Sequence, residues 1–395
     1  MGTVFVGVDV GKEAHYAQLI GVDGVEVFDR PVANDEGSIR RLVADASVCG
    51  IPVLVVDQPS SMIQLLLVVA RETGVRVAYV TGLQMRRAAD LYAGSAKTDP
   101  RDAWVLADYA RRNVDRLTWI DVNDDLLAEL RILNGRDVDL AHDANRTANR
   151  LRDALVSVSP SLERVLGDRL GQAGVRDLIA KYSTPAALRR AGKTRIRGTI
   201  AKRSPRIAER VTETVWVALD AQTVTLPAET RWGQIIGALA EDLDRIHQQR
   251  KTLEADIEEV FLEHPLGEVL ESLCGFGART GARTLAEIGD PHRFADGGRL
   301  AAYAGLTPID RQSGTSIRGA SKNRGGNHRL KNALFLAAFV ASQHDPDAKA
   351  YYQKKRAEGM KHNAAIICLA RRRCNIIIAM LKTATPYNPD LAKAA

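Results

Sequence analysis

The chain has 395 residues, 45% of them hydrophobic, and a formal net charge of +7 at pH 7. This length exceeds one typical core, so we expect two or three domains. The chain has no apolar run of about 20 residues, which excludes a transmembrane helix. Its four scattered cysteines, with no C-x-x-C pair, fit reduced thiols better than a disulfide framework or a zinc site. We expect a cytoplasmic protein without a signal peptide.

The charge is unevenly distributed along the chain. The net charge is −2 over residues 1–118, zero over 119–262 and +9 over 263–395. A polyanion such as nucleic acid would therefore bind first to the last third. On charge alone, a basic surface that only keeps the protein in solution is an equal alternative.

The first third predicts three strands and then alternating helices and strands. This order indicates an RNase H-like (RuvC-like) α/β domain, because a Rossmann fold alternates from its first strand. GVDVGK (7–12) also resembles the phosphate-contacting turn of actin-like sugar kinases, an alternative that would require a duplicated second half. The predicted strands are 3–10, 16–24, 24–32, 52–58 and 75–82, and the predicted helices are 35–48, 60–74, 83–92 and 100–112.

Four aspartates occupy places in these elements where carboxylates could gather. Asp9 ends the first strand and Asp57 ends the fourth, and these strands are neighbours in an RNase H-like sheet. Asp99 and Asp102 begin the helix that follows. Such a cluster can hold Mg²⁺ or Mn²⁺ for phosphodiester chemistry. Alternatively, Asp99 caps the helix with Pro100 at its first position, and the strand-end aspartates accept hydrogen bonds in turns.

Residues 119–262 predict two long amphipathic helices with the 3-4 spacing of a coiled coil. Packed together they would form a hairpin or an ordinary bundle, and packed against a second copy they would form a dimer. Between them, the basic segment 185–206 either contacts nucleic acid or forms a solvated face. The two seams are Leu126, Leu130, Leu133, Asp137, Leu140, Ala144, Thr147, Leu151, Ala154 and Val158, and Ile236, Leu239, Leu243, Ile246, Arg250, Leu253, Ile257 and Val260.

The last third begins with glycines at 275, 277 and 281 before a predicted helix, in LCGFGARTGARTLAEIGD (273–290). This stretch resembles a helix-hairpin-helix turn, whose backbone N–H groups can meet a phosphate. Taken alone it is a weak signal, since many joints between helices contain such glycines.

A polar, glycine-rich segment at 308–326 then precedes an apolar helix from about His328. Ser313 lies at its centre and could attack a phosphodiester, with nearby cations stabilising the developing charge. A loop serine that only makes local hydrogen bonds is the alternative, and Thr315, Ser316 and Ser321 are rival hydroxyls. The cations around it are Arg311, Arg318, Lys322, Arg324, Arg329 and Lys331.

Five motifs follow one another along the chain: GVDVGK, VVDQPS, KTDPRDA, CGFGARTGARTLAEIGD, and GLTPIDRQSG with RGGNHRLKNAL. In this order and at these spacings the chain resembles, over essentially its whole length, the DEDD transposases of the insertion-sequence one-ten family, the bridge-RNA-guided serine recombinases. KTDPRDA and the last block are the most specific parts of the resemblance, whereas GVDVGK alone is weak.

The resemblance implies a RuvC-like DEDD domain at 1–118, a helical, coiled-coil region at 119–262, and a mainly α C-terminal transposase domain with the serine nucleophile at 263–395. It matches Ser313 to the nucleophile and Asp9, Asp57, Asp99 and Asp102 to the four acids that hold the metal. The second acid of the family is usually Glu, so Asp57 is a departure, one methylene shorter. Lys97 and Arg101, near the last two acids, would meet DNA.

The resemblance further implies donor and target DNA, a noncoding guide (bridge) RNA, and a homo-oligomer between dimer and tetramer. We therefore expect an RNA-guided DNA recombinase of an insertion sequence, associated with the nucleoid in a bacterial cytoplasm. One alternative is a RuvC-like nuclease or junction resolvase in which water attacks in place of Ser313. Another is a non-enzymatic nucleic-acid-binding protein that uses the basic last third.

Overall fold

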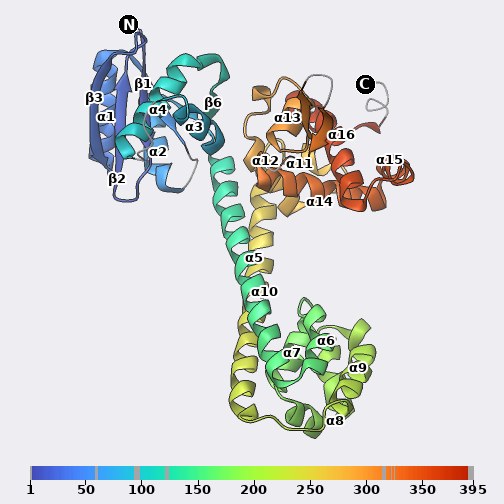
Figure 1. The fold of residues 1–395 in the computed structure, drawn as a ribbon. Coiled ribbons are helices and arrows are strands. Elements are labelled where there is room, and N and C mark those ends of the chain that lie inside the picture. Colours follow the sequence, from blue (N-terminus) through green and yellow to red (C-terminus); the bar gives the residue numbers. More distant parts are fainter. Residues whose placement is uncertain are drawn as a thin grey trace. The chain divides into compact units, whose positions relative to one another are not determined.

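The computed structural model describes residues 2–57, 61–92, 98–120, 124–313, 317–321, 323 and 325–389 (Figure 1). For residues 309–313 and 317–321, and for Ser61, Leu83 and Arg116, it describes the backbone only. The chain divides into two units, Met1–Ile132 with Phe261–Ala395, and Leu133–Val260. Helices make up most of the described residues, and none of these helices is long and apolar enough to cross a membrane.

A six-stranded mixed sheet in the order β3-β2-β1-β4-β5-β6 forms the N-terminal part. Strand β1 pairs with β2 in antiparallel fashion and with β4 in parallel, so the predicted neighbourhood of the first and fourth strands is confirmed. The short strand β6 was not predicted from the sequence, because three residues are too few to show an alternating pattern of apolar and polar side chains. The strands are β1 (Thr3–Asp9), β2 (Ala14–Ile20), β3 (Glu26–Ala33), β4 (Ile51–Val56), β5 (Arg76–Tyr79) and β6 (Thr118–Ile120).

Helices cover both faces of this sheet. Because side chains alternate along a strand, Val4, Val6 and Val8 of β1 join the core shared with α1 and α2. Phe5 of the same strand joins the core shared with α3 and α4. The helices are α1 (Glu36–Cys49), α2 (Gln64–Thr73), α3 (Gly82–Ala89) and α4 (Asp99–Arg112).

Helix α4 lies directly on strand β1 at Gly7. A Cβ atom added to Gly7 would clash with the carbonyl oxygen of Ala103 and lie 2.7 Å from the Ala107 nitrogen. At the other end of the helix, Arg111 donates a hydrogen bond to the carbonyl oxygen of Val22, in the turn after β2, at 3.3 Å. Because β1 and β2 are antiparallel, this turn lies where β1 begins. The first turn of α4 therefore points towards the end of β1.

The second unit contains most of two long helices, α5 (Asp125–Val158) and α10 (Glu229–Glu263). The polar residues of the two predicted seams meet each other, since Arg250 Nε donates to Asp137 Oδ1 at 3.0 Å. Asp137 is only 2% exposed and the Arg250 side chain is 24% exposed, so the carboxylate is buried between the helices and its partner is partly buried. At this level α5 and α10 form a hairpin within one chain. A contact with a second copy stays a prediction.

Four shorter helices connect α5 to α10. The described residues of the C-terminal part form helices and a hairpin, β7 (Ile309–Ser313) and β8 (Ile317–Ser321). The connecting helices are α6 (Pro160–Leu166), α7 (Ala173–Lys181), α8 (Pro185–Ala201) and α9 (Ala208–Asp220). The C-terminal helices are α11 (Gly267–Glu271), α12 (Ala278–Ile288), α13 (Gly297–Tyr303), α14 (His328–His344), α15 (Pro346–Ala357) and α16 (His362–Thr383).

Candidate active site

Asp9 and Asp57 stand at the same edge of the sheet. Asp9 is the last residue of β1, and Asp57 directly follows β4. Val8 and Val56, the residues before them, are partners in the parallel register of the two strands. Neighbouring strands lie about 4.8 Å apart, so the register brings the two aspartate backbones close together. Both residues are half-buried.

Asp99 and Asp102 lie in the first turn of α4, but neither caps the helix. The N-cap residue is Thr98, whose carbonyl oxygen accepts a hydrogen bond from the Asp102 nitrogen at 3.0 Å. Among the described residues, no side chain makes a capping hydrogen bond at this end. The capping interpretation of Asp99 is therefore wrong by one residue. With Thr98 as the N-cap residue, Asp99 takes the first helical position and Pro100 the second, where its missing N–H group is not needed for the helix.

Arg101 holds the start of α4 to the end of the preceding helix. Its guanidinium donates a hydrogen bond to the carbonyl oxygen of Tyr92 at 3.2 Å and approaches that of Ala89 at 3.5 Å. Arg101 was predicted to meet DNA, and the structure gives it a local structural partner as well. Lys97 lies outside the described residues.

Asp108 fixes the far half of α4, and sequence reasoning missed it. Its side chain is 3% exposed, and it accepts hydrogen bonds from Tyr92, from Arg111 at 2.6 Å and from Arg112 at 2.7 Å. Burial alone would raise the pKa of Asp108, but the hydrogen bonds from Tyr92 and Arg111 and the two positive charges outweigh it, so the pKa is lowered. Asp108 is therefore a charged structural anchor at neutral pH.

The four predicted acids offer the right donor chemistry for a magnesium ion. Carboxylate oxygens are the ligands that Mg²⁺ prefers. Two of the carboxylates come from one sheet edge, and two come from the helix turn that points towards it. Across the described ranges, however, no group of three or more His, Cys, Asp or Glu side chains is arranged to hold a metal ion. The four carboxylates are therefore suitable ligands for Mg²⁺ by their chemistry. Among the described residues, however, they are not arranged as a complete set of ligands around one ion.

Ser313 is the last residue of β7, where its backbone is opposite Ile317 of β8. Arg311 is opposite Gly319 in the same hairpin, and Arg318 is opposite Gln312. The side chains of this hairpin are not described. The predicted cations Lys322 and Arg324 lie outside the described residues, as do the rival hydroxyls Thr315 and Ser316, whereas Ser321 ends β8.

Two glycines and a lysine close the base of this hairpin. Gly305 and Gly326 have φ angles of +69° and +89°, a region that favours glycine. A Cβ atom on Gly326 would lie 2.6 Å from the Gly305 nitrogen, so the two backbones touch only because side chains are absent. Lys331 Nζ donates to the carbonyl oxygens of Gly305, at 2.8 Å, and Asn323, at 3.1 Å. Lys331, predicted to contact nucleic acid, therefore ties the two ends of the hairpin segment together.

Asn327 forms a second tie at the same place, and sequence reasoning missed it. Its Oδ1 caps α14 by accepting from the Leu330 nitrogen at 3.0 Å. Its Nδ2 donates to Glu287 Oε2 at 2.7 Å and to the Tyr303 hydroxyl at 3.2 Å. The signal was present in the sequence, since an Asn after two glycines and before an apolar helix is a typical N-cap. Arg329 is only 3.9 Å from Glu287 and 66% exposed, so this ion pair is weak.

Tyr79 ends β5 at the same sheet edge and was also missed. Its register partner in the parallel pair is Val56, the residue before Asp57. Burial raises the pKa of Tyr79 to about 12, with smaller contributions from Tyr303, Asp57 and Glu287. Its phenol therefore stays protonated at neutral pH and can donate a hydrogen bond there.

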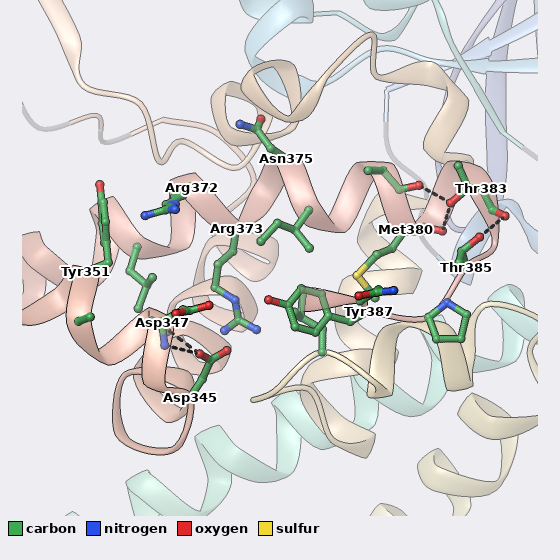
Figure 2. Close-up of a pocket in the computed structure, with 18 of the residues that line it drawn as sticks. Asp345, Asp347, Tyr351, Arg372, Arg373, Asn375, Met380, Thr383, Thr385 and Tyr387 are labelled. Atoms are coloured by element: carbon green, nitrogen blue, oxygen red, sulfur yellow. Dashed lines mark hydrogen bonds between the residues drawn. The ribbon is translucent and has the colours of Figure 1, made fainter. Parts of the chain in front are cut away.

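A cavity of about 920 Å³ lies along α15, α16 and the segment after α16 (Figure 2). Figure 2 shows the Arg373 side chain close to Asp345 and Tyr387. Arg373 donates to the carbonyl oxygens of Ala337, at 2.8 Å, and Cys274, and burial lowers its pKa. These bonds use the guanidinium within the helical packing. None of the predicted site residues lines this cavity.

Comparison with known proteins identifies the family to which the chain belongs. Residues 6–160 match the DEDD transposase profile of the IS110 type, and residues 267–353 match the profile described as transposase of the IS116/IS110/IS902 family. The 43.6 kDa protein of insertion element IS110 from Streptomyces coelicolor is 44% identical, over 97% of this chain and 95% of the relative. The 42 kDa protein of insertion element IS900 from Mycobacterium paratuberculosis is 35% identical, over 99% of each chain.

Among solved structures, the chain is similar to T. thermophilus RuvC in complex with a Holliday junction substrate. The sequence identity is 17%, the TM-score is 0.24, and the match covers 30% of this chain and 99% of the other. The family matches and the two full-length relatives decide the assignment. The chain belongs to the IS116/IS110/IS902 family of transposases.

Proposed function

We propose that this transposase cuts and rejoins DNA strands through a phosphoserine intermediate on Ser313, with Asp9, Asp57, Asp99 and Asp102 as the ligands of Mg²⁺ or Mn²⁺. The observation that carries the proposal is the close packing of α4 on β1 at Gly7. This packing directs the helix turn with two acids towards the sheet edge with the other two. Membership of a transposase family supports DNA as the substrate.

The proposed reaction conserves the number of phosphodiester bonds. The Ser313 hydroxyl attacks the phosphorus atom of a DNA phosphodiester and loses its proton. The bond from phosphorus to one strand breaks, and the oxygen of that strand leaves as a hydroxyl after it takes up a proton. In the second step, a hydroxyl end from another strand attacks the phosphoserine, and the serine hydroxyl is restored. No water and no external energy source enter this exchange.

The four carboxylates would hold the metal ion, which supplies charge neutralisation at the reacting phosphate. Asp57 is the position where the family usually has Glu. Because the aspartate side chain is one methylene shorter, its carboxylate reaches less far from the end of β4. The register of β1 and β4 keeps this position beside Asp9 whichever acid is present.

The residues at the base of the hairpin would orient the nucleophile. Lys331 and Asn327 tie the two ends of the segment that carries Ser313, so its position depends on their hydrogen bonds. The DNA backbone would be met by cations of the hairpin and of the α4 region, where Arg101 has a structural role as well. These cations are Lys97, Arg101, Arg311, Arg318, Lys322, Arg324 and Arg329.

A guide RNA and more than one copy of the chain complete the proposal. Strand exchange joins two DNA duplexes, which requires at least two sets of reacting groups, so we propose a dimer or tetramer. The α5–α10 hairpin is the region we propose for contact between copies. The guide RNA and the division into RuvC-like (1–118), coiled-coil (119–262) and transposase (263–395) domains rest on the family resemblance.

A covalent-adduct assay tests the proposal. The full-length protein is incubated with its element-end DNA, guide RNA and Mg²⁺, and then resolved under denaturing conditions. We expect a protein–DNA adduct with wild type and none with Ser313→Ala. DNA cleavage that persists in Ser313→Ala without any adduct would indicate attack by water, the nuclease or resolvase alternative.

A further inference from the structure

Helix α8 and the turn after it carry a concentration of positive charge. Residues 185–210 contain nine Lys or Arg residues and a single acid, within a region of the chain that is neutral overall. Part of this charge is neutralised by α9. Lys193 pairs with Glu213 at 2.7 Å, and Arg197 pairs with Glu209 at 3.0 Å. The two pairs run in opposite directions along the sequence, so α8 and α9 are antiparallel, and the α8 edge beside α9 is neutralised.

Another face of α8 keeps its charge. Arg195 and Lys202 are exposed, and within the described residues neither makes an ion pair. They are seven residues apart, and Lys202, the C-cap residue of α8, keeps a helical backbone conformation. Seven residues are two helical turns, so the two cations lie on the same face about 10.5 Å from each other along the axis. Ile196 and Ile200, which are fully buried, lie on the inner face. Arg195 and Lys202 thus face solvent.

Gly198 lies between these two cations on the same exposed face. A Cβ atom added there would meet nothing within 4 Å, and the φ angle of Gly198 is not positive. Neither packing nor backbone conformation therefore requires glycine at this position, although glycine weakens a helix. A glycine on this exposed face leaves the helix backbone open to the close approach of a ligand.

We propose that the α8 stripe, defined as Arg195, Gly198 and Lys202, binds the phosphate backbone of duplex DNA. The two side chains would each contact a phosphate, and the glycine would let the DNA strand approach the helix between them. The choice of DNA rests on the proposed function. Single-stranded nucleic acid is recognised by stacking on aromatic side chains, and residues 185–210 contain no Phe, Tyr or Trp. The stripe therefore suits a duplex, read by its charge and not by its sequence.

The test measures the salt dependence of DNA binding by the full-length protein. The probe is a short fluorescent DNA duplex of random sequence, followed by anisotropy over a series of salt concentrations. Each phosphate contact contributes about 0.9 to the slope of log affinity against log salt, so we expect Arg195→Gln/Lys202→Gln to lower the slope by about 1.8. The matched control is Arg164→Gln/Lys181→Gln, two exposed residues of α6 and α7 in the same unit and outside the α5–α10 hairpin.

The control is expected to keep the wild-type slope. An unchanged slope in the stripe variant overturns the proposal. Equal losses in the stripe variant and the control also overturn it, because they would report net charge alone. A duplex RNA of the same length is the third arm. If the stripe variant loses RNA binding and keeps DNA binding, the surface belongs to RNA and the proposal fails.

The Gly198→Ala variant distinguishes an effect on DNA contact from an effect on the stability of the helix. Alanine is the better helix former, so this variant is expected to melt at or above the wild-type temperature, and yet to bind the DNA duplex more weakly, because the added methyl group holds the strand away. Wild-type affinity in a folded Gly198→Ala protein contradicts the role of Gly198. Ser313→Ala is expected to retain wild-type duplex binding, so a failure of the serine mechanism and a failure of the stripe give different results.

Discussion

Gly7 of strand β1 lies directly beneath the carbonyl oxygen of Ala103 in helix α4, with no room for a Cβ atom between them. The glycine is thus a steric requirement of the strand–helix contact. Strand β1 ends two residues later at Asp9, and α4 begins four residues before Ala103 at Asp99. One backbone contact therefore sets the relation between the first acid of the candidate site and the last two.

Gly7→Ala is expected to move α4 away from β1. Overpacking in a core typically costs about 1–3 kcal/mol of unfolding free energy, and the clash here involves backbone, which yields less than a side chain. The measurement is thermal unfolding together with the recombination rate. The control is Gly82→Ala in α3, where a Cβ atom meets nothing within 4 Å. A Gly7→Ala protein as stable and as active as Gly82→Ala would contradict the steric account.

Asp108→Asn is expected to destabilise the same helix. The substitution leaves Arg111 and Arg112 without the buried carboxylate, and breaking a buried ion pair costs about 3–5 kcal/mol. Arg112 is 60% exposed, so solvent reduces its share and we expect the lower end of this range. Urea unfolding measures the change. A loss below about 1 kcal/mol, the value of an exposed pair, would show that Asp108 is not an anchor.

The same residue gives a dependence on pH. Because the pKa of Asp108 is lowered in the folded protein, its contribution to stability is fully present above the unfolded value, about 3.9. It is lost as the pH falls through the lower pKa of the folded state. Stability of wild type and Asp108→Asn is expected to converge below that pH. Curves that stay parallel down to the lowest pH at which both proteins fold would exclude this contribution.

Lys331→Met tests whether the lysine ties the hairpin or binds DNA. Since Lys331 donates to two backbone carbonyls at the base of the hairpin, we expect the variant to form less Ser313 adduct with an unchanged salt slope of DNA binding. Arg329→Met is the comparison, because Arg329 is exposed and only weakly paired. A salt slope lower by about 0.9 in Lys331→Met, with normal adduct formation on bound DNA, would assign Lys331 to phosphate contact.

Asp57→Glu tests the departure from the family pattern. The β1–β4 register holds this position beside Asp9, so we expect the longer acid to support Mg²⁺-dependent recombination, with a shifted Mg²⁺ concentration for half activity. Asp57→Asn keeps the size and removes the charge, and is expected to abolish the reaction. If Asp57→Asn recombines DNA at the wild-type rate, Asp57 is not a metal ligand.

Much of the N-terminal fold follows from sequence, because apolar periods and turn residues are local signals. The predicted neighbourhood of the first and fourth strands, and hence of Asp9 and Asp57, is confirmed by the register. The contact between Gly7 and Ala103 could not be predicted, since it joins residues far apart in the chain. The capping role given to Asp99 was wrong because helix boundaries shift easily by one residue.

At the C-terminal site, too, some features could be predicted from the sequence and others could not. The position of Ser313 in a polar segment was visible in the sequence, but the ties at the base of that segment were not. In the sequence, Lys331 is one of several cations in a basic segment. Only the structure shows that it donates hydrogen bonds to two backbone carbonyl oxygens. In the middle region, Asp137 and Arg250 are polar interruptions of the two apolar seams in the sequence. In the structure, Arg250 donates a hydrogen bond to Asp137.

The central claim is that Ser313 becomes covalently joined to DNA. The most direct measurement is mass spectrometry of the peptide that contains Ser313, taken from full-length protein trapped during reaction with element-end DNA, guide RNA and Mg²⁺. We predict a nucleotide attached through phosphate to Ser313, absent in Ser313→Ala and strongly reduced in Asp102→Asn. DNA products that form with wild type while Ser313 stays unmodified, or that form equally well with Ser313→Ala, would contradict the account.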